Sequence, residues 1–280
     1  MPTLSSPPTQ QPRWNPEAVP PFPGVAMKAL HLMTGTKTSL NELCDMIRPD
    51  AAFSTEVLRM ANSPLVAVSR TISDVQHASM LLGFQRLRNI VITVGVRTYL
   101  SETFTPLLQS CWRHSLACAM IAERAAKACN LDKDFAYTAG IMHDIGRVAL
   151  AVSMPDAYRR VIEAGADQSQ DLLKMEIALC GIDHCQAGGI LFRQWGLPVA
   201  FYEVAIHHHE PDPNETGLAA ILSQSCLLAD VLGFGVAEYR NPPDYSSVVG
   251  NFPEAARSRL PVQRDLATEI TNEIKLIEST

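Results

Sequence analysis

A histidine and an aspartate stand side by side at His143 and Asp144, within an otherwise apolar stretch of small residues. Neighbouring residues on an α-helix point about 100° apart, so this pair does not form one flat face. The pair could bind an ion beside the helix only if other helices supplied the remaining ligands. Six of the eight histidines fall between positions 114 and 209: His114, His143, His184, His207, His208 and His209. This clustering predicts a metal site.

The predicted ligands are His114, His143, Asp144, His184, His208, His209 and Asp230. They are spread over separate predicted helices, and helices joined by short loops can converge their ligands on one point. The pair His143–Asp144 is expected in the middle of a helix over 133–152. Nitrogen and oxygen donors of this kind suit one or two divalent transition metals such as Fe, Mn, Zn or Ni. Asp144, bridging two ions roughly 4 Å apart, would hold a hydroxide for attack on a phosphoester.

A plainer interpretation treats each histidine by itself. A lone buried histidine is usually a hydrogen-bonded core residue, which is the interpretation adopted for His31 and His77. The run 207–209 also fits a solvated helix end, where imidazolium interacts favourably with the helix dipole. Cys185 directly follows His184 and is a weaker candidate for a soft ligand. The joint distribution of the histidines favours the metal site.

Composition narrows the class of protein. The chain has 280 residues, 47% hydrophobic and 19% charged, which is typical of a globular protein. A net charge of −6 argues against a general nucleic-acid binder. No apolar run reaches the length of a membrane span, and the N-terminus lacks the basic start and apolar core of a signal peptide. Seven cysteines without a C-x-x-C pair are typical of reduced core thiols, so we expect a cytoplasmic protein.

The helical periodicity predicts an all-α fold, a helical bundle in two lobes. Residues 1–19, rich in Pro, Ser, Thr and Gln, are expected to be a disordered tail. Residues 20–105 form the predicted N-terminal lobe and residues 106–235 the lobe that carries the histidines. Residues 236–280 are expected to hold a loop and a closing helix, with the loop over 233–261 and the helix over 262–277.

Several motifs resemble known families. The order of His143–Asp144, His184 and His208–His209 is similar to the HD superfamily of metal-dependent phosphohydrolases, and 143–146 to its HD-GYP branch, which hydrolyses cyclic di-GMP. Other motifs resemble the HDOD family (HD-related output domain): Pro20-Pro21-Phe22-Pro23-Gly24, Ile47-Arg48-Pro49-Asp50, the stretches 57–64 and 78–89, Gln194-Trp195-Gly196-Leu197-Pro198, and His208-His209-Glu210-Pro211. The resemblance covers about residues 20–235.

The HDOD resemblance implies an all-helical fold and a bacterial regulatory role, because such proteins generally act as signalling or scaffolding modules. Many of them have lost HD ligands, whereas this chain keeps the whole predicted set.

Three departures from the family pattern count against HD-GYP activity. Arg147 stands where that branch has lysine, no Gly-Tyr-Pro follows Glu210, and Ser110 replaces a glutamate used by trinuclear members. One or two metals are therefore expected rather than three.

Two functions follow. The preferred one is a signal-transduction module that binds other signalling proteins, with a metal site of the HD type. The alternative is a metal-dependent phosphohydrolase that acts on a nucleotide or cyclic dinucleotide. In that case Asp144 and Arg147 would be catalytic, because arginine can clamp a phosphate through two parallel hydrogen bonds.

Overall fold

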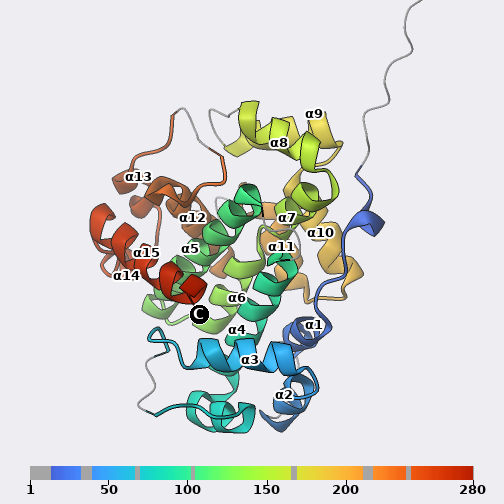
Figure 1. Cartoon of the computed structure of the whole chain (residues 1–280). Coiled ribbons are helices and arrows are strands. Elements are labelled where there is room, and N and C mark those ends of the chain that lie inside the picture. The colour runs from blue at the N-terminus through green and yellow to red at the C-terminus, as the bar shows by residue number, and fades with distance from the viewer. Residues whose placement is uncertain are drawn as a thin grey trace, which may run out of the picture.

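The computed structural model describes residues 14–32, 40–66, 70–101, 105–164, 169–210, 217–237 and 241–279. Within these ranges every regular element is a helix, and no strand occurs (Figure 1). The predicted all-α fold is confirmed. Residues 1–13 of the predicted tail lie outside the described ranges.

The N-terminal part consists of α1 (Gly24–His31), α2 (Leu40–Ile47), α3 (Ala51–Ala61) and α4 (Val75–Ser101). The Asp50 carboxylate starts α3 by accepting a hydrogen bond from the backbone N of Phe53 at 2.9 Å. Gly83 interrupts α4 with a φ of 75°, a left-handed conformation that glycine adopts without steric cost. The long second part of α4 reaches the other lobe.

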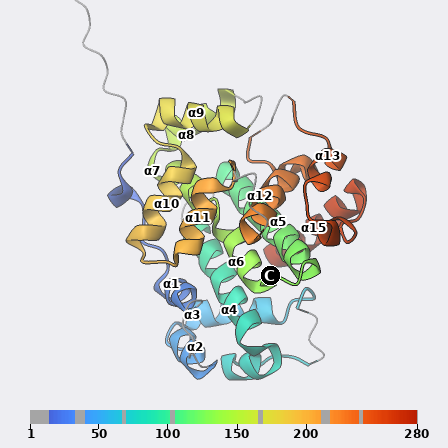
Figure 2. The same cartoon turned by 180° about the vertical axis from the view of Figure 1, so that it is seen from behind.

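The second lobe contains α5 (Pro106–Ala128), α6 (Lys133–Met142), α7 (Ile145–Ser153), α8 (Pro155–Ala164), α9 (Ser169–Cys180), α10 (His184–Gln194), α11 (Val199–His207) and α12 (Leu218–Ala229). The alanine-rich α5 is buried along most of its length and packs against α6 and α12 (Figures 1 and 2). A Cβ on Gly140 of α6 would lie 2.5 Å from Cα of Ala119, so these two helices approach closely only because Gly140 has no side chain.

The helix predicted over 133–152 is in fact two helices. α6 ends at Met142 and α7 begins at Ile145, so the His143–Asp144 pair occupies the break and not the middle of one helix. The break lets α7 turn against α10, where the helices touch at Gly146. A Cβ at that position would lie 2.0 Å from the carbonyl oxygen of His184. Tertiary packing therefore overrides a helical pattern that is continuous in the sequence.

Both ends of the chain differ from the prediction. Residues 14–19 are ordered, because the indole of Trp14 donates to Ser153 Oγ at 3.1 Å and a short turn follows at Pro16–Ala18. The predicted loop over 233–261 contains α13 (Tyr245–Gly250) and α14 (Glu254–Arg257). The closing helix is present as α15 (Gln263–Ser279).

Helix α15 is bonded to both parts of the molecule. Arg97 of α4 donates to the carbonyl oxygen of Ile277 at 3.1 Å, at the C-terminal end of α15. Two arginines of α5 form ion pairs with the same helix, Arg113 with Glu278 and Arg124 with Glu273. The C-terminal helix thus connects the N-terminal lobe with the core of the second lobe.

Candidate metal centre

The seven predicted ligands come from five places in the second lobe. His114 lies on α5, His143 and Asp144 lie between α6 and α7, and His184 is the first residue of α10. His208 and His209 follow α11, and Asp230 follows α12. The rings of His143 and His208 have centroids 4.9 Å apart, and those of His184 and His208 are 5.4 Å apart. The fold therefore brings the imidazoles together.

Asp144 lies at the centre of the imidazoles. Its Oδ1 is 3.3 Å from Nε2 of His184 and 3.3 Å from Nε2 of His208. Its Oδ2 is 3.7 Å from Nε2 of His114 and 3.8 Å from Nε2 of His143. The carboxylate side chain is fully buried, and its Oδ1 has no hydrogen-bond partner within the described ranges, whereas its Oδ2 accepts a hydrogen bond from Nε of Arg147 at 2.8 Å.

In three of the imidazoles the Nδ1 atom already has a hydrogen-bond partner, which leaves Nε2 facing Asp144. Nδ1 of His143 donates to the carbonyl oxygen of Gly140 at 2.7 Å, and Nδ1 of His208 donates to that of Ala205 at 2.9 Å. Nδ1 of His184 lies 2.6 Å from Oε2 of Glu176. Such partners fix the tautomer that presents Nε2 to a metal. Nε2 of His143 is buried and has no hydrogen-bond partner within the described ranges, as expected of a ligand atom.

Three groups of side chains have donor atoms close enough to share an ion, each within 4.8 Å of one another. The groups are His143 with Asp144 and His208; His114 with His143 and Cys226; and His184 with Cys185, His208 and His209. Imidazole, carboxylate and thiolate donors together suit a divalent transition metal. The residues present therefore fit a metal of the kind predicted, and Cys226 is a candidate that the sequence did not suggest.

Asp230 approaches the centre through His114. Its Oδ1 lies 3.2 Å from Nδ1 of His114, whereas Nε2 of the same ring faces Asp144 and lies 3.5 Å from Sγ of Cys226. The two atoms are within ion-pair distance, but Nδ1 of His114 makes no hydrogen bond within the described ranges, and the role of Asp230 as a direct ligand stays a prediction. His207 lies outside the cluster, because it is half exposed and 3.5 Å from Glu203.

Burial and neighbouring charges shift the pKa values of the cluster's titratable groups in different directions. Burial lowers the pKa of His143 to about 3, so this imidazole is neutral and can bind a metal at physiological pH. Burial acts to raise the pKa of Asp144, but Arg147 and the adjacent histidines outweigh it and hold that pKa well below the usual range. Against burial and Arg147, the carboxylates of Glu176 and Asp144 with Cys185 raise the pKa of His184 to about 10.

Sequence reasoning missed Glu176, whose carboxylate is wholly buried. Its Oε2 accepts from the backbone N of His184 at 2.8 Å as well as from the ring, and its Oε1 accepts from the Tyr158 hydroxyl at 2.9 Å. The available signal was a carboxylate in the stripe Leu172–Glu176–Cys180, which has the i, i+4 spacing of a buried helix face.

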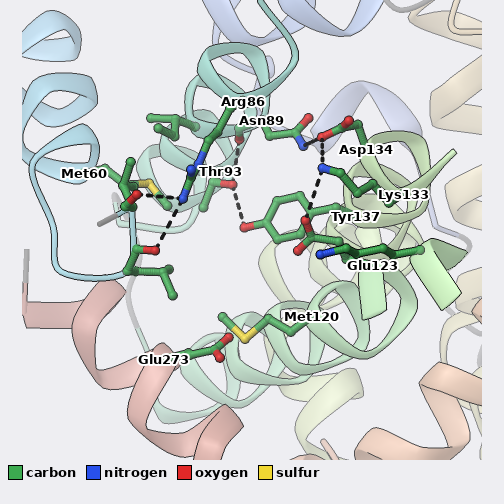
Figure 3. A pocket seen from close by; sticks show the side chains of 14 residues that line it. Met60, Arg86, Asn89, Thr93, Met120, Glu123, Lys133, Asp134, Tyr137 and Glu273 are labelled. Carbon is green, nitrogen blue, oxygen red and sulfur yellow. Dashed lines mark hydrogen bonds and ion pairs between the residues drawn. The ribbon is translucent and has the colours of Figure 1, made fainter. Parts of the chain in front are cut away.

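A cavity lies where the lobes meet, and nothing in the sequence indicated it (Figure 3). It has a volume of about 330 Å³ and is lined by residues of α4, α5, α6 and α15. Asn89 donates to Asp134 at 3.0 Å, and the Thr93 and Tyr137 hydroxyls are 3.1 Å apart at its wall (Figure 3). These bonds join α4 to α6.

Within the described ranges, none of the helices combines the length and the apolar character that crossing a bilayer requires.

Curated proteins with similar sequences are much longer than the matching region. A protein of Treponema pallidum (strain Nichols) with no characterised function is 22% identical over 200 residues, which cover 70% of this chain and 39% of that protein. Ribonuclease Y of Thermus thermophilus is 26% identical over 121 residues, 43% of this chain and 16% of the enzyme. The chain therefore spans less than half the length of either relative.

Solved structures share the fold. An HDOD domain protein of unknown function from Geobacter sulfurreducens has a TM-score of 0.75 and 22% identity, covering 93% of this chain and 91% of its own. A candidate phosphohydrolase from Shewanella amazonensis has a TM-score of 0.69 and 20% identity, with 94% and 95% covered. A candidate signal-transduction protein from Marinobacter aquaeolei has a TM-score of 0.68 and 19% identity, with 93% and 59% covered.

The sequence match to a protein family agrees with the motifs and the fold. The HDOD domain matches residues 19–211, which is more than half of the chain and includes all predicted ligands except Asp230. This chain belongs to the HDOD family.

Proposed function

We propose that this chain is a regulatory signalling module that acts through contacts with other proteins and holds a divalent transition metal in its second lobe. The observation that carries the proposal is the burial of the donor atoms. The side chains of Asp144, His184 and His208 are completely buried. Structural metal sites are closed by protein ligands, whereas catalytic sites keep a position open to substrate. Burial of the central ligands favours a structural metal.

The metal would be held by the Nε2 atoms of the histidines and by the Asp144 carboxylate. When bound, the ion would add to the positive charge that Arg147 already places beside Asp144 at the centre of the lobe. The identity of the ion is proposed as Fe, Mn, Zn or Ni from the donor types. The described cysteines are all free thiols, which suits the reducing environment of the cytoplasm.

Metal content and turnover test the proposal together. We expect the purified full chain, supplied with Mn²⁺ or Fe²⁺ under anaerobic conditions, to retain metal and to leave bis(p-nitrophenyl) phosphate intact. We expect Asp144→Asn to lower the metal content and still to rescue a strain that lacks the gene, provided that its abundance is normal. A chain of normal abundance that fails to rescue would contradict the signalling role, because a scaffold does not need the charge of Asp144.

One observation favours the alternative, a metal-dependent phosphohydrolase acting on a nucleotide or cyclic dinucleotide. A cavity of about 370 Å³ borders His209 and Cys185 at the edge of the cluster, with Lys174 also in its lining. A phosphate entering there would approach the histidines. Chromatographic detection of product from cyclic dinucleotides, lost in Asp144→Asn, would establish this second function.

A further inference from the structure

A permanent cation is buried among the predicted metal ligands. Nε of Arg147 donates to Oδ2 of Asp144 at 2.8 Å, and Nη2 lies 3.1 Å from Nε2 of His184. Nη1 donates to the Tyr158 hydroxyl at 3.3 Å. Arg147 is only 3% exposed, and an arginine side chain keeps its charge in proteins. The guanidinium is therefore a built-in positive charge beside the central carboxylate.

The guanidinium is held by a closed ring of side chains. The Tyr158 hydroxyl donates to Glu176, whose other oxygen bonds to His184, and His184 lies 3.3 Å from Oδ1 of Asp144. The residues of this ring come from the break before α7 and from the four helices α7, α8, α9 and α10. Removing the guanidinium would leave buried partners without a hydrogen bond, which costs more than the bond itself contributes. Arg147 is thus anchored inside the cluster.

A metal on His184 would compete with Arg147. An ion bound to Nε2 of His184 lies about 2.0–2.1 Å from that nitrogen, and Nη2 of Arg147 lies 3.1 Å from the same atom. Both cations would also need the Asp144 carboxylate. Like charges so close in a low-dielectric interior repel strongly. The two groups of donors that contain His143 do not include His184. Oδ1 of Asp144, unlike Oδ2, has no hydrogen-bond partner within the described ranges, so an ion on this side can use Oδ1 while Oδ2 keeps its bond to Arg147.

We propose that the Arg147 guanidinium takes the place of a second metal ion, so that the cluster binds one ion on the His143 side. This inference rests on the metal site of the proposed function and specifies its stoichiometry. With one ion, Asp144 bridges a metal and a guanidinium instead of two metals. The hydroxide that a two-metal hydrolase holds between its ions then has no second ion to bind it.

Metal stoichiometry of the full chain tests the inference. After titration with Mn²⁺ and removal of unbound ion, we expect one ion per wild-type chain and two per Arg147→Met chain. Methionine keeps an unbranched apolar side chain but removes the charge. The matched control is Arg124→Met, which removes a partly buried arginine paired with Glu273 away from the cluster. We expect the control to bind one ion.

Electron paramagnetic resonance of the Mn²⁺-loaded wild type gives a readout that needs no variant. An isolated ion shows resolved hyperfine lines, whereas two ions a few ångströms apart broaden each other's signal. A coupled pair in the wild type, or a folded Arg147→Met chain with one ion, would overturn the inference and leave the metal site intact. If neither chain retains Mn²⁺, Fe²⁺ or Zn²⁺, both the inference and the metal site of the proposed function are wrong.

Discussion

Glu176 offers the sharpest test of how the metal centre is supported. Its carboxylate accepts three hydrogen bonds, two from His184 and one from Tyr158, without touching the predicted ion site itself. Glu176→Gln keeps the shape of the side chain. It removes the negative charge and turns one of the two acceptor oxygens into a donor. At least one of the three donors then faces an amide NH₂ group.

The magnitude follows from these contacts. Hydrogen bonds to a charged group contribute about 1.5–3 kcal/mol and neutral ones about 0.5–1.5 kcal/mol, and a buried donor left without an acceptor costs a further 1–3 kcal/mol or so. Relief of the buried charge offsets part of this loss. We therefore expect the metal-free variant to lose about 2–3 kcal/mol of unfolding free energy. Because Glu176 holds His184, whose Nε2 lies 3.3 Å from Oδ1 of Asp144, we also expect metal affinity to fall, by roughly 10–100-fold.

Denaturant unfolding followed by circular dichroism measures the first effect, and calorimetric titration with Mn²⁺ measures the second. Glu163→Gln is the matched control. Glu163 and Arg159 form an exposed ion pair within α8, the helix that precedes α9. Such surface pairs contribute at most about 1 kcal/mol. If Glu176→Gln behaves like this control in both measurements, the network around His184 does not support the site.

Two further predictions concern packing and pH. Gly146→Ala would place a Cβ 2.0 Å from the His184 carbonyl oxygen and 2.4 Å from the backbone N of Gly188. Because these are backbone atoms, we expect the unfolding free energy in denaturant to fall by about 3 kcal/mol, the upper end of the usual cost of overpacking. Gly24→Ala is the control, because its Cβ would have no neighbour within 4 Å in the described structure, and it should change stability little. Equal stability of the two variants would contradict the close contact of α7 with α10. Burial acts to lower the pKa of His208, but Cys185, as a thiolate, and the Asp144 carboxylate outweigh it and raise that pKa to about 9 in the metal-free protein. His208 belongs to the donor group that also contains His143 and Asp144. It is protonated at pH 7 and must release a proton to bind a metal, so Mn²⁺ affinity should rise as the pH rises from 6 towards 9. Titrations in buffers of different ionisation enthalpy measure the released proton, and an affinity independent of pH would show that His208 is not a ligand.

The fold class could be read from the sequence because helical periodicity is a local property. Apolar spacing and capping residues such as Asp50 and Thr105 act within a few residues of the chain. The short helices α13 and α14 were missed, since turn-forming prolines and glycines outweigh a brief helical pattern. The ordered turn after Trp14 was missed because its partners, Ser153 and Cys180, are distant in sequence.

The candidate ligands could be named from the sequence because histidine and aspartate are potential metal ligands by residue type alone, whatever their position. Their roles could not be assigned in the same way. Asp144 is central because the break between α6 and α7 turns it towards four imidazoles. That break depends on the contact of Gly146 with α10, which no local pattern records.

The sequence by itself determined the helical class, the family motifs and the set of residues able to bind a metal. Only the tertiary structure decided what surrounds those residues. Arg147 suggested a phosphate clamp in the sequence, and packing places its guanidinium against Asp144 and Tyr158 inside the lobe. Glu176 lies in a buried stripe that the sequence contains, but its role depends on folding, which brings α9 against the start of α10. The physical reason is that a side chain's charge and hydrogen-bonding capacity are fixed by its type, whereas its burial and its partners are set by helices far apart in the chain.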